Sequence, residues 1–306
     1  MTSMAATTTP AHLLKVSDLK PRQLDRLLDL AAEMKAEPLG WRDAQAGKVL
    51  ACFFGKPSTR TRVSLEAAAQ RLGMLPLMLR PDELQLGRGE PISDTGRVLS
   101  SYVDAITVRT FAHSDVEELA AAATVPVINA LTDEHHPCQA LADLLTIREH
   151  FGQLEGVRVA YLGDGNNVAH SLMEAGALAG MEVVVSTPCG YRPHADIEIA
   201  SRAMLEADPF EAVRGAQVVY TDVWVSMGDD ADREDRLDAL ANYHVSAAIM
   251  DGAARDALFM HCLPAHRGEE VAAEVIDGPR SVVFQQAANR LPTEQALIHT
   301  LIERWQ

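Results

Sequence analysis

The sequence predicts an α/β protein with two doubly wound parallel-sheet domains and an active-site cleft between them. Short apolar segments alternate with longer segments whose apolar residues recur at helical spacing, which is the pattern of βαβ units. A polar turn at residues 151–155 separates two halves of similar size. We therefore expect one domain at residues 1–151 and a second at residues 152–306.

Segments of apolar residues mark the strands. In the first half we expect strands at 49–54, 75–79, 104–108 and 125–129, and in the second half at 157–162, 182–186, 217–221, 258–261 and 281–284. Helices lie between them, including one from Thr59 to Leu72 that Gly73 ends and a long one from Pro137 to about His150. Residues 285–306 have helical spacing and are long enough to pack back across the domain junction.

Composition argues against some classes of partner. The 306 residues are 47% hydrophobic, which is enough to bury a sizeable core. The formal net charge of −16 disfavours nucleic acid and anionic membrane surfaces, because either would repel an acidic chain. An anionic substrate must therefore meet a local cluster of positive charge.

The cysteines and the N-terminus indicate a cytoplasmic protein. No apolar segment approaches the ~20 residues needed to cross a bilayer. Residues 1–9 lack the arginines of a transit peptide and the apolar segment of a secretory signal. The four cysteines have no pairing spacing, as expected in a reducing compartment: Cys52, Cys138, Cys189 and Cys262.

The segment Ser58-Thr59-Arg60-Thr61-Arg62 predicts a phosphate-binding site. It follows a buried strand and begins a helix, so it combines free backbone N–H groups, a positive dipole end, hydroxyls and guanidinium. Arg60 and Arg62 lie about 200° apart on a helix, so we expect only Arg60 to face the ligand. Taken alone, the motif fits equally well an ordinary helix cap with surface arginines.

Two further strand ends in the first half carry hydrogen-bond donors. Arg109 directly follows the strand expected to end at Val108, and His136 and Gln139 lie where the helix beginning at Pro137 starts. Each of these residues alone has a structural explanation, since histidine often serves buried hydrogen bonding. Together they predict a site that stabilises an oxyanion or polarises a carbonyl.

In the second half, Gly163-Asp164-Gly165-Asn166-Asn167 follows a strand and opens a helix, which suggests a dinucleotide site. The third glycine of that fingerprint is missing, and asparagines stand where a pyrophosphate needs bare backbone. Asn167, Asp222 and Ser226 are groups of a kind that could hold an amino acid's ammonium and carboxylate. Each alone could also be a helix cap or a loop residue.

Cys262 has several interpretations. A metal site with His261 and His266 is disfavoured, because Pro264 breaks any helical ligand face. A covalent nucleophile needs a base, and His261 is expected to point to the opposite face of the strand. A thiol that contacts a substrate amine and a buried structural cysteine remain open.

Four motifs together resemble the ornithine carbamoyltransferase branch of the aspartate/ornithine carbamoyltransferase family, over the chain from about Leu14. They are Phe54 to Arg62, His136-Pro137-Cys138-Gln139, Asp222 to Gly228, and His261-Cys262-Leu263-Pro264. The first two resemble all carbamoyltransferases and imply carbamoyl phosphate. The last two resemble the ornithine branch and imply the acceptor.

The resemblance implies roles for individual residues. It places Arg109, His136 and Cys262 at the reaction centre, and it implies that residues 1–151 bind carbamoyl phosphate and residues 152–306 bind ornithine. The implied carbamoyl phosphate contacts are Ser58, Thr59, Arg60, Thr61, Gln85, Arg109, His136, Gln139, Cys262, Leu263 and Arg290. The implied ornithine contacts are Asn167, Asp222, Ser226 and Met227.

The implied reaction transfers a carbamoyl group to the δ-amine of L-ornithine, giving L-citrulline and phosphate, in arginine biosynthesis or the urea cycle. The resemblance further implies a homotrimer, no organic cofactor and no metal. Gln285 and Ala288 stand where the family usually has an Asp and a Glu, which puts the support of Arg290 in question. Alternatives are another acceptor (putrescine, aspartate or an acylated ornithine), a nucleotide-dependent oxidoreductase, and a binding relative without activity.

Overall fold

The computed structural model describes residues 12–80, 89–225 and 232–303. Contacts divide the chain into two compact units, which are Met1–Thr132 with Leu291–Gln306, and Asp133–Arg290. The sequence placed a boundary at residue 151. By contacts, helix α5 (Pro137–Phe151) belongs to the second unit, because it packs against helix α6 (Asn167–Ala179).

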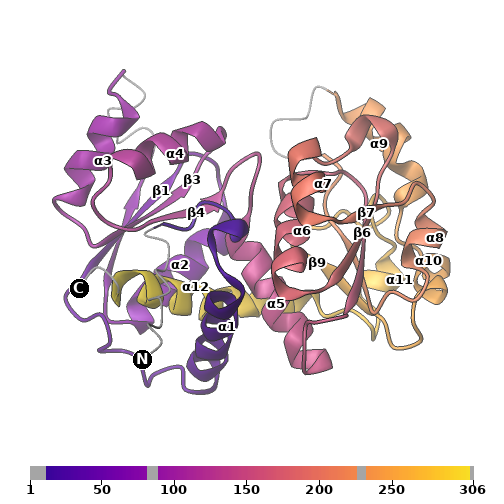
Figure 1. The fold of residues 1–306 in the computed structure, drawn as a ribbon, viewed down its shortest axis with the longest axis horizontal. Helices are drawn as coiled ribbons and strands as arrows, with labels where there is room; N and C mark the ends of the chain where they lie inside the picture. The colour runs from indigo at the N-terminus through magenta and orange to yellow at the C-terminus, as the bar shows by residue number, and fades with distance from the viewer. Residues whose placement is uncertain (1–11, 81–88, 226–231, 304–306) are drawn as a thin grey trace, which may run out of the picture. The chain divides into compact units, whose positions relative to one another are not determined.

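The first unit is a four-stranded parallel sheet with helices on both faces (Figure 1). The strand order is β2-β1-β3-β4. Strands β2 and β3 therefore lie on opposite sides of β1, and the direction of winding changes between them. Helix α2 (Thr59–Arg71) packs on β1 and β2, while α3 and α4 pack on the opposite face. The remaining elements are α1 (Pro21–Ala36), β1 (Val49–Phe54), β2 (Leu75–Leu79), α3 (Ile92–Ser100), β3 (Ala105–Arg109), α4 (His113–Ala122) and β4 (Val127–Leu131).

The second unit is a five-stranded parallel sheet of order β7-β6-β5-β8-β9. Its core includes the fully buried Tyr161, Tyr220 and Phe259. The strands are β5 (Arg158–Leu162), β6 (Glu182–Ser186), β7 (Met204–Leu205), β8 (Val218–Thr221) and β9 (Leu258–His261). The helices besides α5 and α6 are α7 (Ala195–Ser201), α8 (Pro209–Val213), α9 (Arg233–Leu240), α10 (Ala247–Gly252), α11 (Ala273–Ile276) and α12 (Val283–Ile302), of which α12 continues into the first unit from Leu291.

Most expected strands are present, with a few corrections. The strand expected at 281–284 is wrong: only Ser281 pairs, through a single bridge to Phe259, and Val283 already begins α12. Strand β4 starts at Val127 rather than residue 125, because Pro126 has no N–H to donate to a ladder. Strand β3 runs to Arg109, so this arginine is the last residue of the strand.

Gly73 ends helix α2 as expected. Its φ is +81°, and an added Cβ would lie 2.3 Å from the carbonyl oxygen of Arg42. A larger residue would therefore have to move the chain between α1 and β1 as well as adopt a left-handed backbone.

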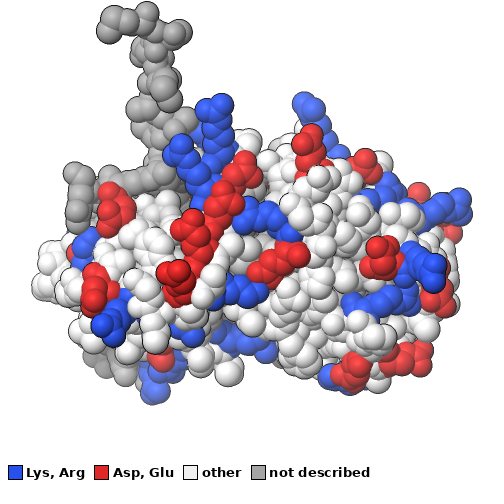
Figure 2. Space-filling view, turned by 90° about the horizontal axis from the view of Figure 1, so that it is seen from below, with Lys and Arg blue, Asp and Glu red and all other residues white. Residues whose placement is uncertain are grey.

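Within the residues described, no helix has the length and apolar character that crossing a membrane requires. All four cysteines are free. Burial raises the pKa of Cys52 to about 12, which leaves that thiol unreactive. On the face drawn in Figure 2, acidic and basic side chains are interspersed.

Candidate functional site

The first group of predicted residues lies at the carboxyl end of β1 and β3, where the first sheet changes winding direction. Such a switch point is where open α/β sheets bind ligands. The loop after β1 leads into α2, and β3 ends at Arg109. We call the residues placed here the unit 1 site: Ser58, Thr59, Arg60, Thr61 and Arg109.

The N-terminus of α2 has the geometry of an anion site. Ser58 is the N-cap, and its hydroxyl accepts a hydrogen bond from the backbone N–H of Thr61 (3.2 Å). Arg62 instead forms an ion pair with Glu66 one turn along the helix (Nε to Oε1, 3.2 Å). The guanidinium of Arg62 is thus already paired along the helix, and the assignment of Arg60 to the ligand stays a prediction.

Arg109 and Lys56 add positive charge beside this helix start. Arg109 is only 7% exposed, and its carbonyl oxygen accepts a hydrogen bond from Gly55 N–H (2.7 Å). Lys56 is 5% exposed, and its ammonium lies 4.2 Å from the centroid of the Phe111 ring. Although the chain as a whole is acidic, two cationic side chains lie near the start of α2, where free backbone N–H groups could bind a phosphate. The sequence analysis did not select Lys56, although it stands in the same motif.

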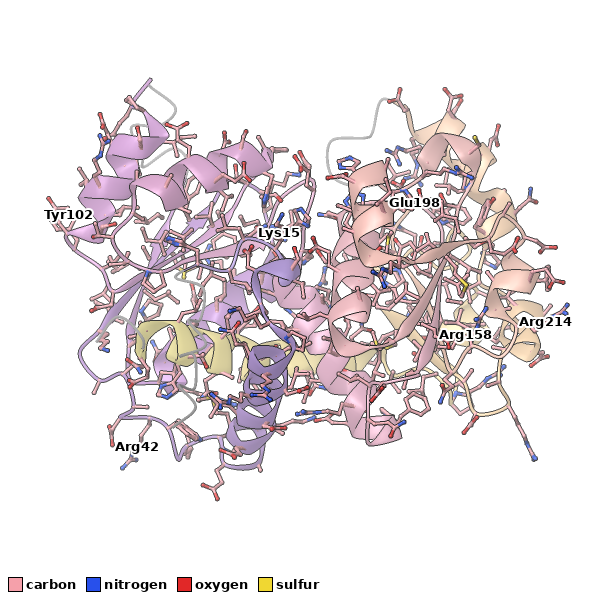
Figure 3. The ribbon with its side chains drawn as sticks, in the orientation of Figure 1. Lys15, Arg42, Tyr102, Arg158, Glu198 and Arg214 are labelled. Atoms are coloured by element: carbon pink, nitrogen blue, oxygen red, sulfur yellow. The ribbon has the colours of Figure 1, made fainter. Side chains whose placement is uncertain are left out.

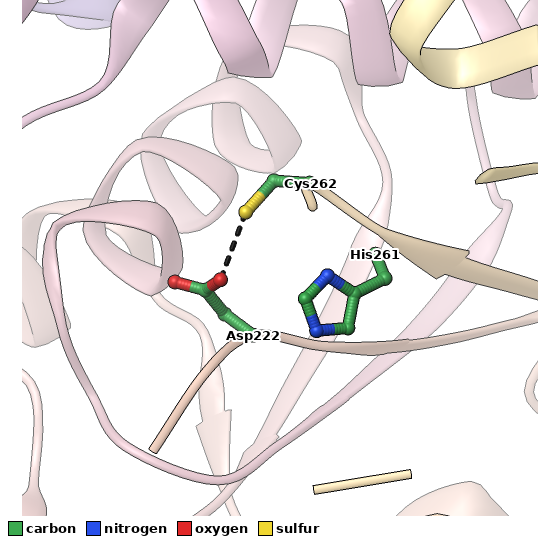
Figure 4. Close-up of side chains that lie close together, drawn as sticks. All are labelled: Asp222, His261 and Cys262. Atoms are coloured by element: carbon green, nitrogen blue, oxygen red, sulfur yellow. Dashed lines mark hydrogen bonds between the residues drawn. The ribbon is translucent and has the colours of Figure 1, made fainter. Parts of the chain in front are cut away.

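The second group lies at the switch point of the second sheet, at the carboxyl ends of β5 and β8, with β9 beside them. Asp222 follows β8 and is 5% exposed. One carboxylate oxygen accepts from Asn166 Nδ2 (3.0 Å) and the other from the thiol of Cys262 (2.8 Å; Figure 4). We call these three residues, with His136, Gln139, Asn167, Leu263 and Arg290, the unit 2 site.

Asn166 connects this carboxylate to helix α6. Its side-chain oxygen caps the helix by accepting from the backbone N–H of Val168 (2.9 Å) and Ala169 (3.3 Å). The amide nitrogen is thereby turned toward Asp222. Asn167, the residue that the sequence analysis selected, is the first residue of α6 and half-buried.

The hydrogen bonds of His261 argue against Cys262 as an activated nucleophile. A ring nitrogen of His261 lies within 4.8 Å of the thiol sulfur, so strand alternation alone does not separate them. Nδ1 of His261 accepts from Leu263 N–H (2.9 Å), which leaves the proton on Nε2, facing Glu270 (3.2 Å). Neither nitrogen is then available as a base, and the adjacent carboxylate of Asp222 favours the neutral thiol.

Leu263 has a left-handed backbone, with φ of +59°. A non-glycine residue in this region stores roughly 1–3 kcal/mol of strain, and its hydrogen bond to His261 holds it there. The strain therefore coincides with the residue whose carbonyl was predicted to bind substrate.

His136 and Gln139 are placed by the start of α5. His136 is the N-cap residue, and its backbone N–H donates to Ser171 Oγ on α6 (2.7 Å). His170 supports the same loop by bonding to the carbonyl oxygen of Glu134 (2.9 Å), and burial lowers the pKa of His170 to about 4. The imidazole of His170 is thus a neutral structural group, which is the more common role of an isolated histidine.

Gln139 belongs to a buried polar network. Its Oε1 accepts from Arg290 Nη1 (2.9 Å), and its Nε2 donates to Asp143 Oδ1 (2.8 Å). Asp143 also accepts from Gln286 Nε2 (2.7 Å) and from the Tyr220 hydroxyl (3.2 Å). The carboxylate of Asp143 on α5 therefore connects this helix to β8 and α12. It is also linked indirectly to β9, because Gln286 accepts from the backbone N–H of His261.

The departure from the family pattern at Gln285 and Ala288 does not touch Arg290. Gln285 hydrogen-bonds to Glu149 and His150 at the C-terminal end of α5 (2.8 Å each), and Ala288 is exposed. Arg290 takes its support from Gln139 instead. The role of Arg290 in binding carbamoyl phosphate stays a prediction.

In the β5–α6 turn, another segment of the protein packs against the backbone of Gly165. An added Cβ at Gly165 would lie 2.4 Å from the backbone nitrogen of Pro193, so that backbone is already covered. A pyrophosphate needs the same approach. The geometry therefore argues against the dinucleotide alternative.

Two clusters of the described residues have ligand-type atoms within 4.8 Å of one another: Asp222, His261 and Cys262, and His266, Glu269 and Glu270. In the first cluster, hydrogen bonds already occupy both nitrogens of His261 and both oxygens of Asp222. The expectation that no metal is needed remains a prediction. Gln85, Ser226 and Met227 lie outside the described residues.

Two sequence models of one family match the chain. Residues 11–149 match the model described as aspartate/ornithine carbamoyltransferase, carbamoyl-P binding domain, and residues 155–301 match the model described as Asp/Orn binding domain. The chain belongs to the aspartate/ornithine carbamoyltransferase family.

Relatives in this family are similar over nearly their whole length. A protein of Symbiobacterium thermophilum named ornithine carbamoyltransferase is 53% identical over 302 residues, covering 94% of this chain and 96% of that one. A Bacillus subtilis protein of the same name is 50% identical over 299 residues, covering 95% and 93%.

Solved structures of carbamoyltransferases have the same fold. The crystal structure of ornithine carbamoyltransferase from Thermus thermophilus is 45% identical, with a TM-score of 0.90 and coverage of 96% of this chain and 100% of that one. The ornithine carbamoyltransferase from Pyrococcus furiosus is 49% identical, with a TM-score of 0.89 and coverage of 94% and 95%. The predicted fold class, two parallel-sheet α/β domains, is confirmed.

Proposed function

We propose that the chain transfers the carbamoyl group of carbamoyl phosphate to the δ-amine of L-ornithine, giving L-citrulline and phosphate, for arginine biosynthesis in the cytoplasm. Residues 1–151 would bind carbamoyl phosphate and residues 152–306 would bind ornithine. The two family segments, 11–149 and 155–301, support this division. The relatives named ornithine carbamoyltransferase support the choice of acceptor.

The observation that carries the proposal is the charge of Asp222. Among the described residues, the two hydrogen-bonded partners of its carboxylate are neutral, an amide and a thiol. The negative charge is therefore left for a cationic ligand, such as the α-ammonium of ornithine. Aspartate would bring two carboxylates, and an acylated ornithine lacks a charged α-amine.

The proposed mechanism uses donors that are in place before the reaction. Ser58, Thr59, Arg60 and Thr61 would hold the phosphate, and Thr61, Arg109 and His136 would polarise the carbamoyl oxygen. The δ-amine, if it titrates as lysine does, is neutral in roughly one molecule in a thousand at about pH 7.4. That neutral amine attacks the carbonyl carbon, and the same donors stabilise the oxyanion. The C–O bond to phosphate then breaks, and the leaving phosphate takes up the proton that the attacking nitrogen loses.

The remaining assignments rest on the family resemblance. Gln139 and the Leu263 carbonyl would hold the carbamoyl NH2, assisted by Arg290 and, from outside the described residues, Gln85. Asn167 and Met227 would bind the ornithine carboxylate, and Ser226 would lie near its α-amine.

The direct test measures the carbamoylated product, which is citrulline when the amine is ornithine, formed from carbamoyl phosphate by the purified chain with each of four amines: L-ornithine, putrescine, L-aspartate and N-acetyl-L-ornithine. We expect a preference for ornithine of at least roughly 100-fold in kcat/KM, because a site built for a charged group rejects an analogue lacking it. A preference for another amine would reassign the acceptor, and inactivity with all four would favour a binding relative.

Cys262→Ala should retain turnover at a reduced rate. The thiol hydrogen-bonds to Asp222, so its loss removes a contact that orients the carboxylate; this costs about 1 kcal/mol, or roughly fivefold in kcat/KM for ornithine. Steady-state kinetics checks the size of the loss. Mass spectrometry of the unmutated protein with carbamoyl phosphate alone checks the mechanism, since a carbamoyl thioester on Cys262 would establish the nucleophile role instead.

We also propose a homotrimer. The first unit exposes large apolar side chains, and an exposed apolar edge strand is commonly covered by another chain. Tyr102 is 72% exposed and lies at the periphery of that unit (Figure 3). The others are Leu39, Val63, Leu75, Leu77, Val98 and Phe111, with Leu75 and Leu77 on the edge strand β2. Sedimentation equilibrium should give the mass of three chains, and Leu75→Lys with Leu77→Lys should lower it.

A further inference from the structure

The carboxylate of Asp143 lies one helical turn beyond Gln139 on α5 and is buried with it. The side chains are 1% and 2% exposed. Residues four apart share one face of a helix, and here Gln139 Nε2 donates to Asp143 Oδ1 at 2.8 Å. No role in binding or turnover follows for Asp143 from the family motifs described above.

The partners of Gln139 require one orientation of its amide. A carboxylate only accepts hydrogen bonds, so Asp143 requires the NH2 end of Gln139 to face it. Arg290 only donates, so it requires the oxygen end, and its Nη1 lies 2.9 Å from Gln139 Oε1. Both neighbours exclude the flipped amide, in which NH2 would face the guanidinium and oxygen would face the carboxylate.

We propose that Asp143 is a positioning residue, whose buried carboxylate fixes the Gln139 amide with its oxygen turned to Arg290 and presented to the carbamoyl NH2 of the substrate. This proposal rests on the proposed function. Carbamoyl phosphate offers both an NH2 and a carbonyl oxygen, so an amide of the wrong orientation would set NH2 against NH2. The step that Asp143 controls is therefore recognition of the carbamoyl end of the substrate.

Asp143 is itself held from the other elements around it. Gln286 on α12 donates to Oδ1, the Tyr220 hydroxyl on β8 donates to Oδ2, and Gln286 also accepts from the backbone N–H of His261. The charged and titratable groups that act on it are Arg290 and Tyr220. Burial raises the pKa of Asp143 to about 6, while these hydrogen bonds and the charge of Arg290 lower it.

The main experiment is a double-mutant cycle with citrulline kinetics at pH 7.5. Gln139→Leu and Asp143→Leu should each raise KM for carbamoyl phosphate by roughly tenfold or more, because both remove the positioned acceptor. The double variant should match Gln139→Leu within about twofold, because Asp143 acts through Gln139. Tyr220→Phe removes a different partner of Asp143 and should change KM by less than about twofold.

A pH comparison covers the case in which Asp143→Leu does not fold. In the wild type, kcat/KM for carbamoyl phosphate should fall as pH drops through about 6, because protonated Asp143 can face Gln139 with an O–H donor. Asp143→Asn cannot titrate, so this component should be missing. Titration of the substrate phosphate is common to both enzymes, and the ratio of the two profiles therefore reports Asp143.

The outcomes separate the two proposals. If the wild type makes no citrulline, the proposed function fails and this inference fails with it. If the wild type is active and Gln139→Leu weakens carbamoyl phosphate binding, additive effects in the cycle, together with parallel pH profiles, overturn the role of Asp143 alone. A coupled cycle, or a pH ratio that changes near 6, supports it.

Discussion

Arg60→Ala lowers kcat/KM for carbamoyl phosphate by roughly 100-fold or more, which corresponds to about 3 kcal/mol of transition-state stabilisation. Arg60 is the second residue of α2, where the helix presents free N–H groups and the N-cap Ser58 is formed. Loss of its guanidinium removes a charged donor just where the departing phosphate gains charge. Initial-rate kinetics with both substrates varied measures the loss.

The matched control is Arg62→Ala in the same helix turn. Arg62 is 43% exposed and already paired with Glu66, which is 37% exposed. An exposed pair of this kind contributes less than about 1 kcal/mol to stability, so activity should stay within about twofold. Equal losses for the two variants would mean that the segment acts only through overall positive charge, and the assignment of Arg60 would be wrong.

Asp222→Asn raises KM for ornithine and lowers kcat/KM by at least roughly 30-fold. Removing one member of a buried charge pair costs about 2–5 kcal/mol, and Asp222 is 5% exposed with its carboxylate already oriented by Asn166 and Cys262. Binding of carbamoyl phosphate should be unaffected. Kinetics with ornithine, together with calorimetric titration of carbamoyl phosphate, separates these two effects.

An analogue tests the same contact from the side of the substrate. The wild type should use 5-aminopentanoate, which is ornithine without its α-amine, far less well than ornithine, whereas Asp222→Asn should show little discrimination. Asp277→Asn, which removes a carboxylate paired with Arg267 at the surface, is the control and should behave as wild type. Full discrimination retained by Asp222→Asn would move the ammonium contact elsewhere.

The sequence predicted the fold and the strand-end residues because both depend on local patterns. Strand β1 is a continuous apolar segment, and the helix start at Ser58 has a cap, hydroxyls and arginines within five residues. Parallel strands bring their carboxyl ends to one edge. Residues as distant in sequence as Asn166 and Asp222 could therefore be expected near one another.

The parts that could not be predicted depend on contacts between distant segments. Asp143 could have been noticed from its i,i+4 spacing to Gln139, but Gln286 and Tyr220 carry no local signal of that network. The segment 281–284 has β-branched residues that favour a strand. Helix α12 begins there nonetheless, because tertiary packing outweighs local propensity in so short a segment.

Asn166 performs two tasks with one amide, and this restricts what can replace it. Aspartate caps a helix as well as asparagine does, and a redesign guided by helix stability alone would accept the exchange of one nitrogen for one oxygen. Here that nitrogen lies 3.0 Å from a carboxylate oxygen of Asp222. The exchange would set two like charges against each other and draw a proton to the pair. Replacing Asn166 by aspartate would thus leave the helix cap intact. It would, however, turn a site for an ammonium group into a pair of carboxyl groups that share a proton.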